Sequence, residues 1–128
     1  MKNLILILFS VTLFSCSKLP ASGSGNNSSS NSAKIKAKVV RITCASTIIE
    51  ILDVAHYNLG VSWTIEGTTN TFEHVVVVAN KCEFPNTLKE GDIFYFKETN
   101  ESDAHNDCAV CAMYDFPPSK SLFLKVVN

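Results

Sequence analysis

Cysteine supplies the most reactive side chains of this sequence, and the spacing of two of them matches a known redox arrangement. Cys108 and Cys111 stand three positions apart, as in thiol–disulfide oxidoreductases, where a helix N-terminus lowers the pKa of the first thiol. Here the pair follows a polar stretch and precedes Pro117 and Pro118, with no strand–helix–strand pattern beside it. We therefore expect structural disulfides at these positions rather than a redox centre.

A zinc site is the second chemistry that the cysteines suggest. Structural zinc is typically held by two close pairs of ligands. This chain has one close pair, because Cys44 and Cys82 each stand alone. Apart from Cys16 the chain has four cysteines, and an even number in a small exported domain is typical of disulfides instead. We expect two disulfides and no metal.

The other polar side chains show no catalytic arrangement. A polar loop at 100–107 contains Glu101, Asp103, His105 and Asp107, which could bind a divalent ion, although a solvated acidic loop is the commoner outcome. His56 and His74 lie in unrelated segments. No serine occupies a nucleophile elbow, and no glycine-rich phosphate loop occurs. We expect neither an enzyme nor a bound cofactor.

The charge balance argues against a nucleic-acid partner. The 128-residue chain has a net charge of −1, and from Lys34 onward nine basic residues face twelve acidic ones. A nucleic-acid-binding domain usually carries a basic stripe. The basic cluster at Lys34, Lys36, Lys38 and Arg41 is better explained as a solvated strand face.

The aromatic residues offer a candidate binding face. Along 93–96 the side chains of Ile93 and Tyr95 point one way and those of Phe94 and Phe96 the other. One set must belong to the core, which is the default place for aromatic residues. An outward Tyr95 close to Trp63 would form a platform for a sugar or a peptide.

Short stretches of alternating or β-branched residues dominate the chain from Lys34 onward, and no helical periodicity extends over a long segment. We expect six strands, with turns between them, at 34–44, 47–54, 61–66, 72–79, 93–97 and 122–127. The inward set of the first strand changes from Ile35, Ala37 and Val39 to Val40 and Ile42. Such a slip of one residue is typical of a β-bulge.

These elements predict an all-β fold, a small closed or partly open antiparallel barrel. A long, bulged first strand can pair in both halves of a five-stranded barrel. The segment from Lys89 to Phe96, KEGDIFYF, resembles the start of a central strand in OB-folds. The whole region 34–128 resembles small, cysteine-bearing, OB-like lipoprotein domains, most of which have no assigned activity. An immunoglobulin-like sandwich is the alternative.

The barrel favours one of the three possible disulfide connectivities. Cys44 ends the first strand and Cys111 precedes the last, and these strands lie near each other at the seam of a barrel. Cys82 follows the central strand, where a bridge to Cys108 would fix the loop at 79–88. We expect Cys44–Cys111 and Cys82–Cys108, with the swapped pairing and a local Cys108–Cys111 loop left open.

The N-terminus has the layout of an export signal. Lys2 precedes an apolar run at 4–14 that is too short to span a bilayer stably, which takes roughly 20 residues. The run ends in Leu13-Phe14-Ser15-Cys16, which resembles the lipobox of bacterial lipoproteins. Residues 1–15 are therefore expected to be a signal peptide, and 16–33 an acylated Cys16 with a flexible Ser/Gly/Asn tether before the domain at 34–128.

This resemblance implies a location in the cell envelope, with acyl chains on Cys16 holding the protein to a bilayer. We expect the outer rather than the inner membrane. The sequence predicts a non-catalytic envelope module that binds a protein, peptide or glycan partner. The alternative is an inhibitor of a host or competitor hydrolase such as lysozyme.

Overall fold

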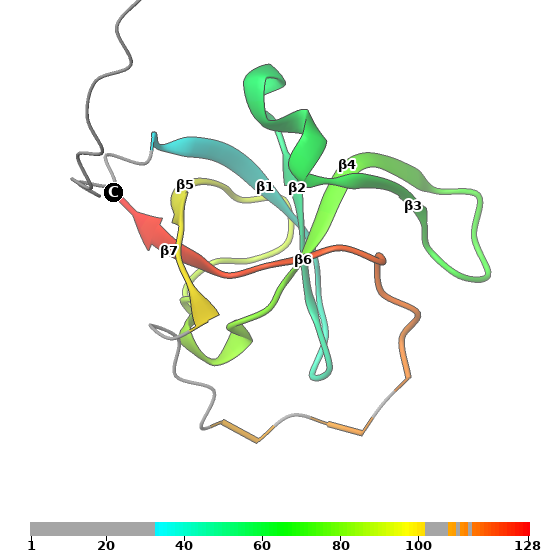
Figure 1. Cartoon of the computed structure of the whole chain (residues 1–128). Helices are drawn as coiled ribbons and strands as arrows, with labels where there is room; N and C mark the ends of the chain where they lie inside the picture. Colours follow the sequence, from blue (N-terminus) through cyan, green and yellow to red (C-terminus); the bar gives the residue numbers. More distant parts are fainter. Residues whose placement is uncertain (1–32, 102–107, 110, 113) are drawn as a thin grey trace, which may run out of the picture.

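A computed structural model describes residues 33–101, 108–109, 111–112 and 114–128 of the chain (Figure 1). The expected signal peptide, Cys16, nearly all of the tether and most of the polar loop at 100–107 lie outside these residues. The elements, in chain order, are β1 (Ile35–Ile42), β2 (Thr47–Ile51), η1 (Val54–Leu59), β3 (Val61–Thr64), β4 (Thr71–Val78), η2 (Lys81–Glu83), β5 (Ile93–Glu98), β6 (Ser121–Leu122) and β7 (Leu124–Val127), where η marks a 3-10 helix.

The strands form one sheet that curls into a partly open barrel. Their order is β3-β4-β2-β1-β5-β7, with antiparallel neighbours, and β6 pairs with β4 in parallel. Only Phe123 separates β6 from β7, so one segment reaches from β4 to β5. The expected all-β fold is thus confirmed, and the seven strands of the described residues lie in one sheet that is not closed.

The bulge expected in the first strand is confirmed. The register of β1 against β2 shifts between Val39 and Arg41. β1 pairs with β5 from Ile35 to Lys38 and with β2 from Ala37 to Ile42, so Ala37 and Lys38 have a strand on each side. Val40, the extra residue, packs on the outer face of the sheet.

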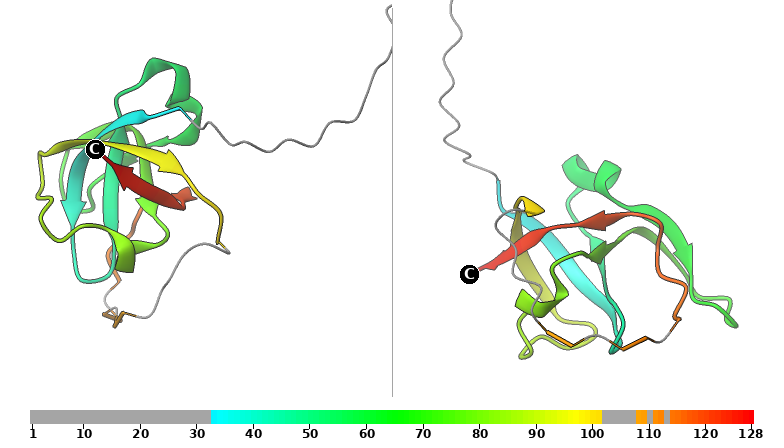
Figure 2. Two further views of the ribbon diagram at one scale, coloured as in Figure 1. Left: turned by 90° about the vertical axis from the view of Figure 1, so that its left-hand side faces the viewer. Right: turned by 60° about the horizontal axis from the view of Figure 1, so that its bottom comes forward.

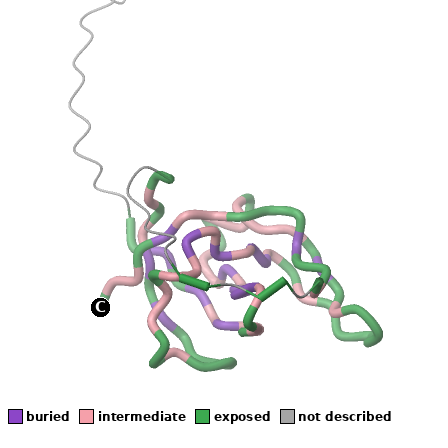
Figure 3. Tube along the Cα trace, turned by 90° about the horizontal axis from the view of Figure 1, so that it is seen from below, coloured by how far each residue is buried: buried purple, intermediate pink, exposed green. Residues whose placement is uncertain are grey.

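Two apolar clusters lie on opposite faces of the sheet. Neighbouring residues of a strand point to opposite faces, so Ile49 and Val76 enter the barrel interior while Ile48 and Val75 face outward. The interior cluster also includes Phe94, and buried residues gather in the middle of the barrel (Figure 3). The outward pair is covered by Trp63, which makes a second, smaller cluster.

The expected strand at 47–54 is too long at its C-terminal end. β2 stops at Ile51, and the Asp53 carboxylate accepts a hydrogen bond from the Ala55 N–H and starts the 3-10 helix η1. Gly60, the residue after η1, is in extended conformation and lies against the backbone of His74 on β4. A Cβ at position 60 would lie 2.2 Å from the His74 carbonyl carbon, so only glycine permits this approach.

Candidate functional site

The two disulfides join the loops at one end of the barrel. Cys44 bonds to Cys111, and Cys82 bonds to Cys108, with Cα–Cα distances of 5.4 Å in both pairs. This is the connectivity that the strand order favours. Since Cys108 and Cys111 bond to different partners, the segment that carries them is fixed at two points: at the β1–β2 loop and at η2. The redox arrangement would instead require these two cysteines to bond to each other.

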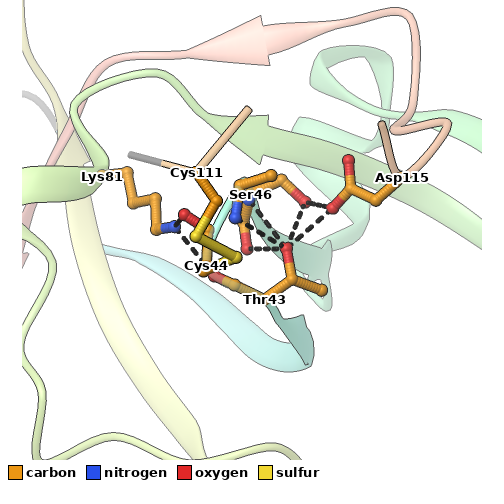
Figure 4. Close-up of a disulfide and its surroundings, with 7 residues drawn as sticks. Thr43, Cys44, Ser46, Lys81, Cys111 and Asp115 are labelled. Atoms are coloured by element: carbon orange, nitrogen blue, oxygen red, sulfur yellow. Dashed lines mark hydrogen bonds between the residues drawn. A yellow bond between two sulfur atoms is a disulfide. The ribbon is translucent and has the colours of Figure 1, made fainter. Parts of the chain in front are cut away.

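A carboxylate strengthens the first of these junctions (Figure 4). One oxygen of Asp115 accepts hydrogen bonds from Thr43 Oγ1 at 2.7 Å and from Ser46 Oγ at 2.5 Å. The Thr43 hydroxyl oxygen also accepts the backbone N–H of Ser46, which shapes the β1–β2 loop. We call Thr43, Ser46 and Asp115 the Asp115 clamp. It holds residues about 70 positions apart in the sequence.

Electrostatics favour the ionised form of this carboxylate. Desolvation pushes the pKa of Asp115 up, but the hydrogen bonds from Ser46 and Thr43 and the charge of Arg41 outweigh it and leave the pKa below its usual range. Lys81, at the start of η2, donates from Nζ to the carbonyl oxygens of Thr43 and Cys44. Burial lowers the pKa of this ammonium, and the charge of Asp115 opposes the shift.

Two exposed aromatic side chains flank the clamp carboxylate. Tyr114 is 77% exposed and Phe116 is 46% exposed, and their rings meet edge to face at 4.2 Å between centroids. Phe116 has a φ of +42°, which is rare for a bulky residue and often marks a functional site. We call Tyr114 and Phe116 the aromatic pair. The sequence contained no local signal for it, since its exposure depends on the distant partners of Asp115.

Trp63 contacts the segment that carries this pair. Its side chain is only 9% exposed and packs at 6.4 Å from the ring of Phe72. Its Nε1 donates to the carbonyl oxygen of Phe116 at 2.8 Å. The outer cluster therefore covers the outer face of β2 and β4.

The structure does not bring Trp63 and Tyr95 into one binding face. Tyr95 does point outward, at 44% exposure, while Phe94 and Phe96 fill the interior. However, β3 and β5 are not neighbours in the sheet. Tyr95 instead borders a separate hollow of about 340 Å³ with Leu88, Ile93 and Val127 among its lining residues.

Two smaller hollows share Lys81 at the disulfide end. One, of about 320 Å³, is lined by Val77, Ala79 and Cys82 among others, and one of about 260 Å³ by Ile42 and Phe84 among others. Thr47 and Asn86 are further polar residues that line the second of these hollows. The two hollows place small concave surfaces beside the Asp115 clamp.

The histidines within the described residues make local contacts. His56 Nδ1 lies 3.2 Å from the Asp53 carboxylate, and the ring of His74 stacks on Tyr57 at 3.7 Å. No group of three or more His, Cys, Asp or Glu side chains in the described part of the chain is arranged to hold a metal ion. The positions Asp103, His105 and Asp107 lie outside that part.

Two further findings bear on identity. In the described ranges, no helix has both the length and the apolar character needed to cross a membrane. No protein-family model, curated protein or solved structure matches the chain.

Proposed function

We propose that this protein is a lipid-anchored, non-catalytic module of the cell envelope that binds a protein, peptide or glycan partner through the aromatic pair. The observation that carries the proposal is the exposure of Tyr114 and Phe116 on a segment fixed by Cys111 and Asp115. Aromatic residues provide a large share of the binding energy at interfaces. A backbone that is already fixed loses little further entropy on binding.

The hydroxyl groups beside the pair support a structural role and not a catalytic one. Ser46 is buried at the base of the clamp, and its hydroxyl donates a hydrogen bond to the Asp115 carboxylate. The Thr43 hydroxyl donates to the same carboxylate. An activated nucleophile would need an accessible oxygen and a base such as histidine within hydrogen-bond reach.

The lipid anchor is tested on the protein purified from membranes. Mass spectrometry is expected to find Cys16 as the first residue, carrying diacylglyceryl on its thiol, because Leu13 to Cys16 has the lipobox pattern. An intact Met1 or an unmodified Cys16 would contradict the anchor.

Partner binding is tested by site-specific photo-crosslinking in the native envelope. A photoreactive amino acid at position 114 is expected to capture a partner. The matched control is position 54, because Val54 is 75% exposed, close to the 77% of Tyr114, and lies on η1. Equal crosslinking at the two positions would show that capture depends on exposure alone and would contradict the proposal.

The second candidate is a hydrolase inhibitor, and the double fixation of the aromatic segment favours it. An inhibitor needs a loop that keeps its shape in a foreign active site, and a preorganised loop gives such binding. Under this candidate the protein inhibits a lysozyme-type hydrolase, and Tyr114→Ala weakens the inhibition at least about tenfold, as for an aromatic hot spot. Full hydrolase activity at saturating protein would exclude it.

A further inference from the structure

The outer face of the sheet formed by β1, β5 and β7 has a composition unlike the rest of the domain. Directly opposite residues share a face, and the register places Lys36 beside Tyr95, and Tyr95 beside Val127. The same rows pair Lys38 with Ile93, and Lys97 with Lys125. The left panel of Figure 2 looks toward these strands, in cyan, yellow and red. We call this surface the basic face; its residues are Lys36, Lys38, Ile93, Tyr95, Lys97, Lys125 and Val127.

The apolar centre of this face is exposed and rigid. Ile93 and Tyr95 are 55% and 44% exposed, although they alternate with the buried residues Phe94 and Phe96. The packing of these two phenylalanines in the barrel interior fixes which way β5 turns its outer side chains. An isoleucine and a tyrosine surrounded by lysines are therefore presented permanently to the surroundings.

The charge of the face opposes that of the domain. Four lysines lie on it, within a region that carries nine basic and twelve acidic residues. Lys38 forms an ion pair with Glu50 of β2 at 2.6 Å, at the edge of the face. The register rows of β1, β5 and β7 place no acidic side chain among Lys36, Lys97 and Lys125.

The chain leading back to Cys16 joins the domain at this same face. β1 begins at Ile35, directly before Lys36, and Lys34 Nζ donates to the backbone carbonyl oxygen of Asn128 at the end of β7. For a flexible chain, the 17 residues between Cys16 and Lys34 give a typical end-to-end distance of about 23 Å. A lipid on Cys16 would therefore keep the basic face within reach of the bilayer.

We propose that the basic face docks on the surface of a bilayer that contains anionic phospholipid, which rests on the lipid anchor of the proposed function. Lysines near a negatively charged bilayer each strengthen binding about fivefold. Tyrosine is enriched at the level of the headgroups, where its ring meets apolar chains and its hydroxyl meets water. Because the basic face is the outer surface of β1, β5 and β7, these strands then lie along the bilayer. The Asp115 clamp lies outside this face, since Thr43 follows the last residue of β1.

Nitration of tyrosine on the full chain tests this orientation. The protein is reconstituted in vesicles of phosphatidylcholine, with or without phosphatidylglycerol, and modified tyrosines are measured by mass spectrometry. Nitration of Tyr95 is expected to fall at least about fivefold on the anionic vesicles and to recover in high salt, which screens surface charge. Tyr114 serves as the internal reference, since it lies on the stapled segment at the clamp.

A charge variant separates electrostatic docking from simple proximity. In Lys36→Gln/Lys97→Gln/Lys125→Gln, Tyr95 is expected to be nitrated on anionic vesicles as fast as on neutral ones. The control, Lys89→Gln/Lys120→Gln, removes two exposed lysines that lie outside the basic face and is expected to behave like the unmodified protein.

Each outcome decides one point. Equal ratios of Tyr95 to Tyr114 nitration on both kinds of vesicle, with the protein bound, would overturn the docking face and leave the anchor intact. Protection of Tyr114 instead of Tyr95 would also overturn it. Failure of the protein to bind neutral vesicles would contradict the lipid anchor. In that case protection of Tyr95 on anionic vesicles would still support docking through the basic face, and failure to bind anionic vesicles as well would overturn it.

Discussion

Replacing Asp115 by alanine is expected to cost about 3 kcal/mol of folding stability. The carboxylate accepts two hydrogen bonds, at 2.7 Å from Thr43 and 2.5 Å from Ser46. A bond to a charged group contributes about 1.5–3 kcal/mol. Thr43 recovers part of the loss, because its hydroxyl already lies 3.3 Å from the Ser46 carbonyl oxygen. The buried Ser46 hydroxyl loses the carboxylate as acceptor.

Urea unfolding of the protein with its disulfides intact measures this cost. Trp63 is the single tryptophan, is nearly buried and donates to Phe116, so its fluorescence reports on the region of the clamp. With a slope of about 1–1.5 kcal/mol per molar urea, the midpoint for Asp115→Ala is expected to fall by about 2–3 M. Asp115→Asn keeps an acceptor oxygen but loses the charge, so its midpoint is expected to lie between that of Asp115→Ala and that of the protein without substitutions.

The pH dependence gives a second, independent check. The pKa of folded Asp115 lies below its ordinary value, so this group stabilises the fold above the ordinary pKa of about 3.9, and the effect is lost as the pH falls through the folded value. The stability difference between the unmodified protein and Asp115→Asn is therefore expected to shrink from pH 6 to pH 3. Equal urea midpoints for Asp115→Ala and the protein without substitutions would refute the reasoning. A stability difference between that protein and Asp115→Asn that is the same at pH 6 and pH 3 would refute it as well.

Three more substitutions test other contacts. Cys44→Ala/Cys111→Ala is expected to lower the free energy of unfolding by about 4 kcal/mol, because the disulfide joins residues 67 positions apart. Calorimetry should show a melting temperature at least about 15 °C lower. An unchanged melting temperature would mean that the disulfide is not formed. Gly60→Ala is expected to cost at least about 3 kcal/mol, because the added Cβ would meet the His74 backbone. Gly67→Ala, with φ at +75° and open space around it, should cost only about 1 kcal/mol; urea midpoints that rank the two glycine variants the other way would contradict the packing at position 60.

The strands were predictable from sequence because their signals are local. The phase slip after Val39 marks the bulge, and the alternation along β5 separates Ile93 and Tyr95 from the phenylalanines. Which of the two sets is buried depends on the rest of the barrel, and the sequence left that open. η1 was missed because a 3-10 helix of six residues is too short for a periodicity to be detected, and Asp53 was its only signal.

The candidate site was less predictable because it is built from tertiary contacts. Asp115 reads in the sequence as one acidic residue before two prolines, and its partners lie about 70 residues away. The exposure of Tyr114 follows from that anchoring. Trp63 was a candidate for a platform with Tyr95, beside the default of a place in the core. The sheet separates their strands, and Trp63 packs in the outer cluster with its Nε1 donating to Phe116.

One amide side chain closes the seam of the barrel where the backbone does not. Asn80 is buried just after β4, and its Nδ2 donates to the Leu124 carbonyl oxygen while its Oδ1 accepts the Leu124 N–H. It thus copies both hydrogen bonds of a peptide group, and Nδ2 also donates to Glu83. Aspartate has a carboxyl group in place of the amide of asparagine, and only its protonated form could donate a hydrogen bond as Nδ2 does. β4 and β6 would keep their backbone pairing after hydrolysis of this single amide, but at neutral pH a carboxylate oxygen would face the Leu124 carbonyl oxygen. The chemical ageing of one side chain would therefore weaken the barrel beside this pairing until acid protonates the new carboxyl group.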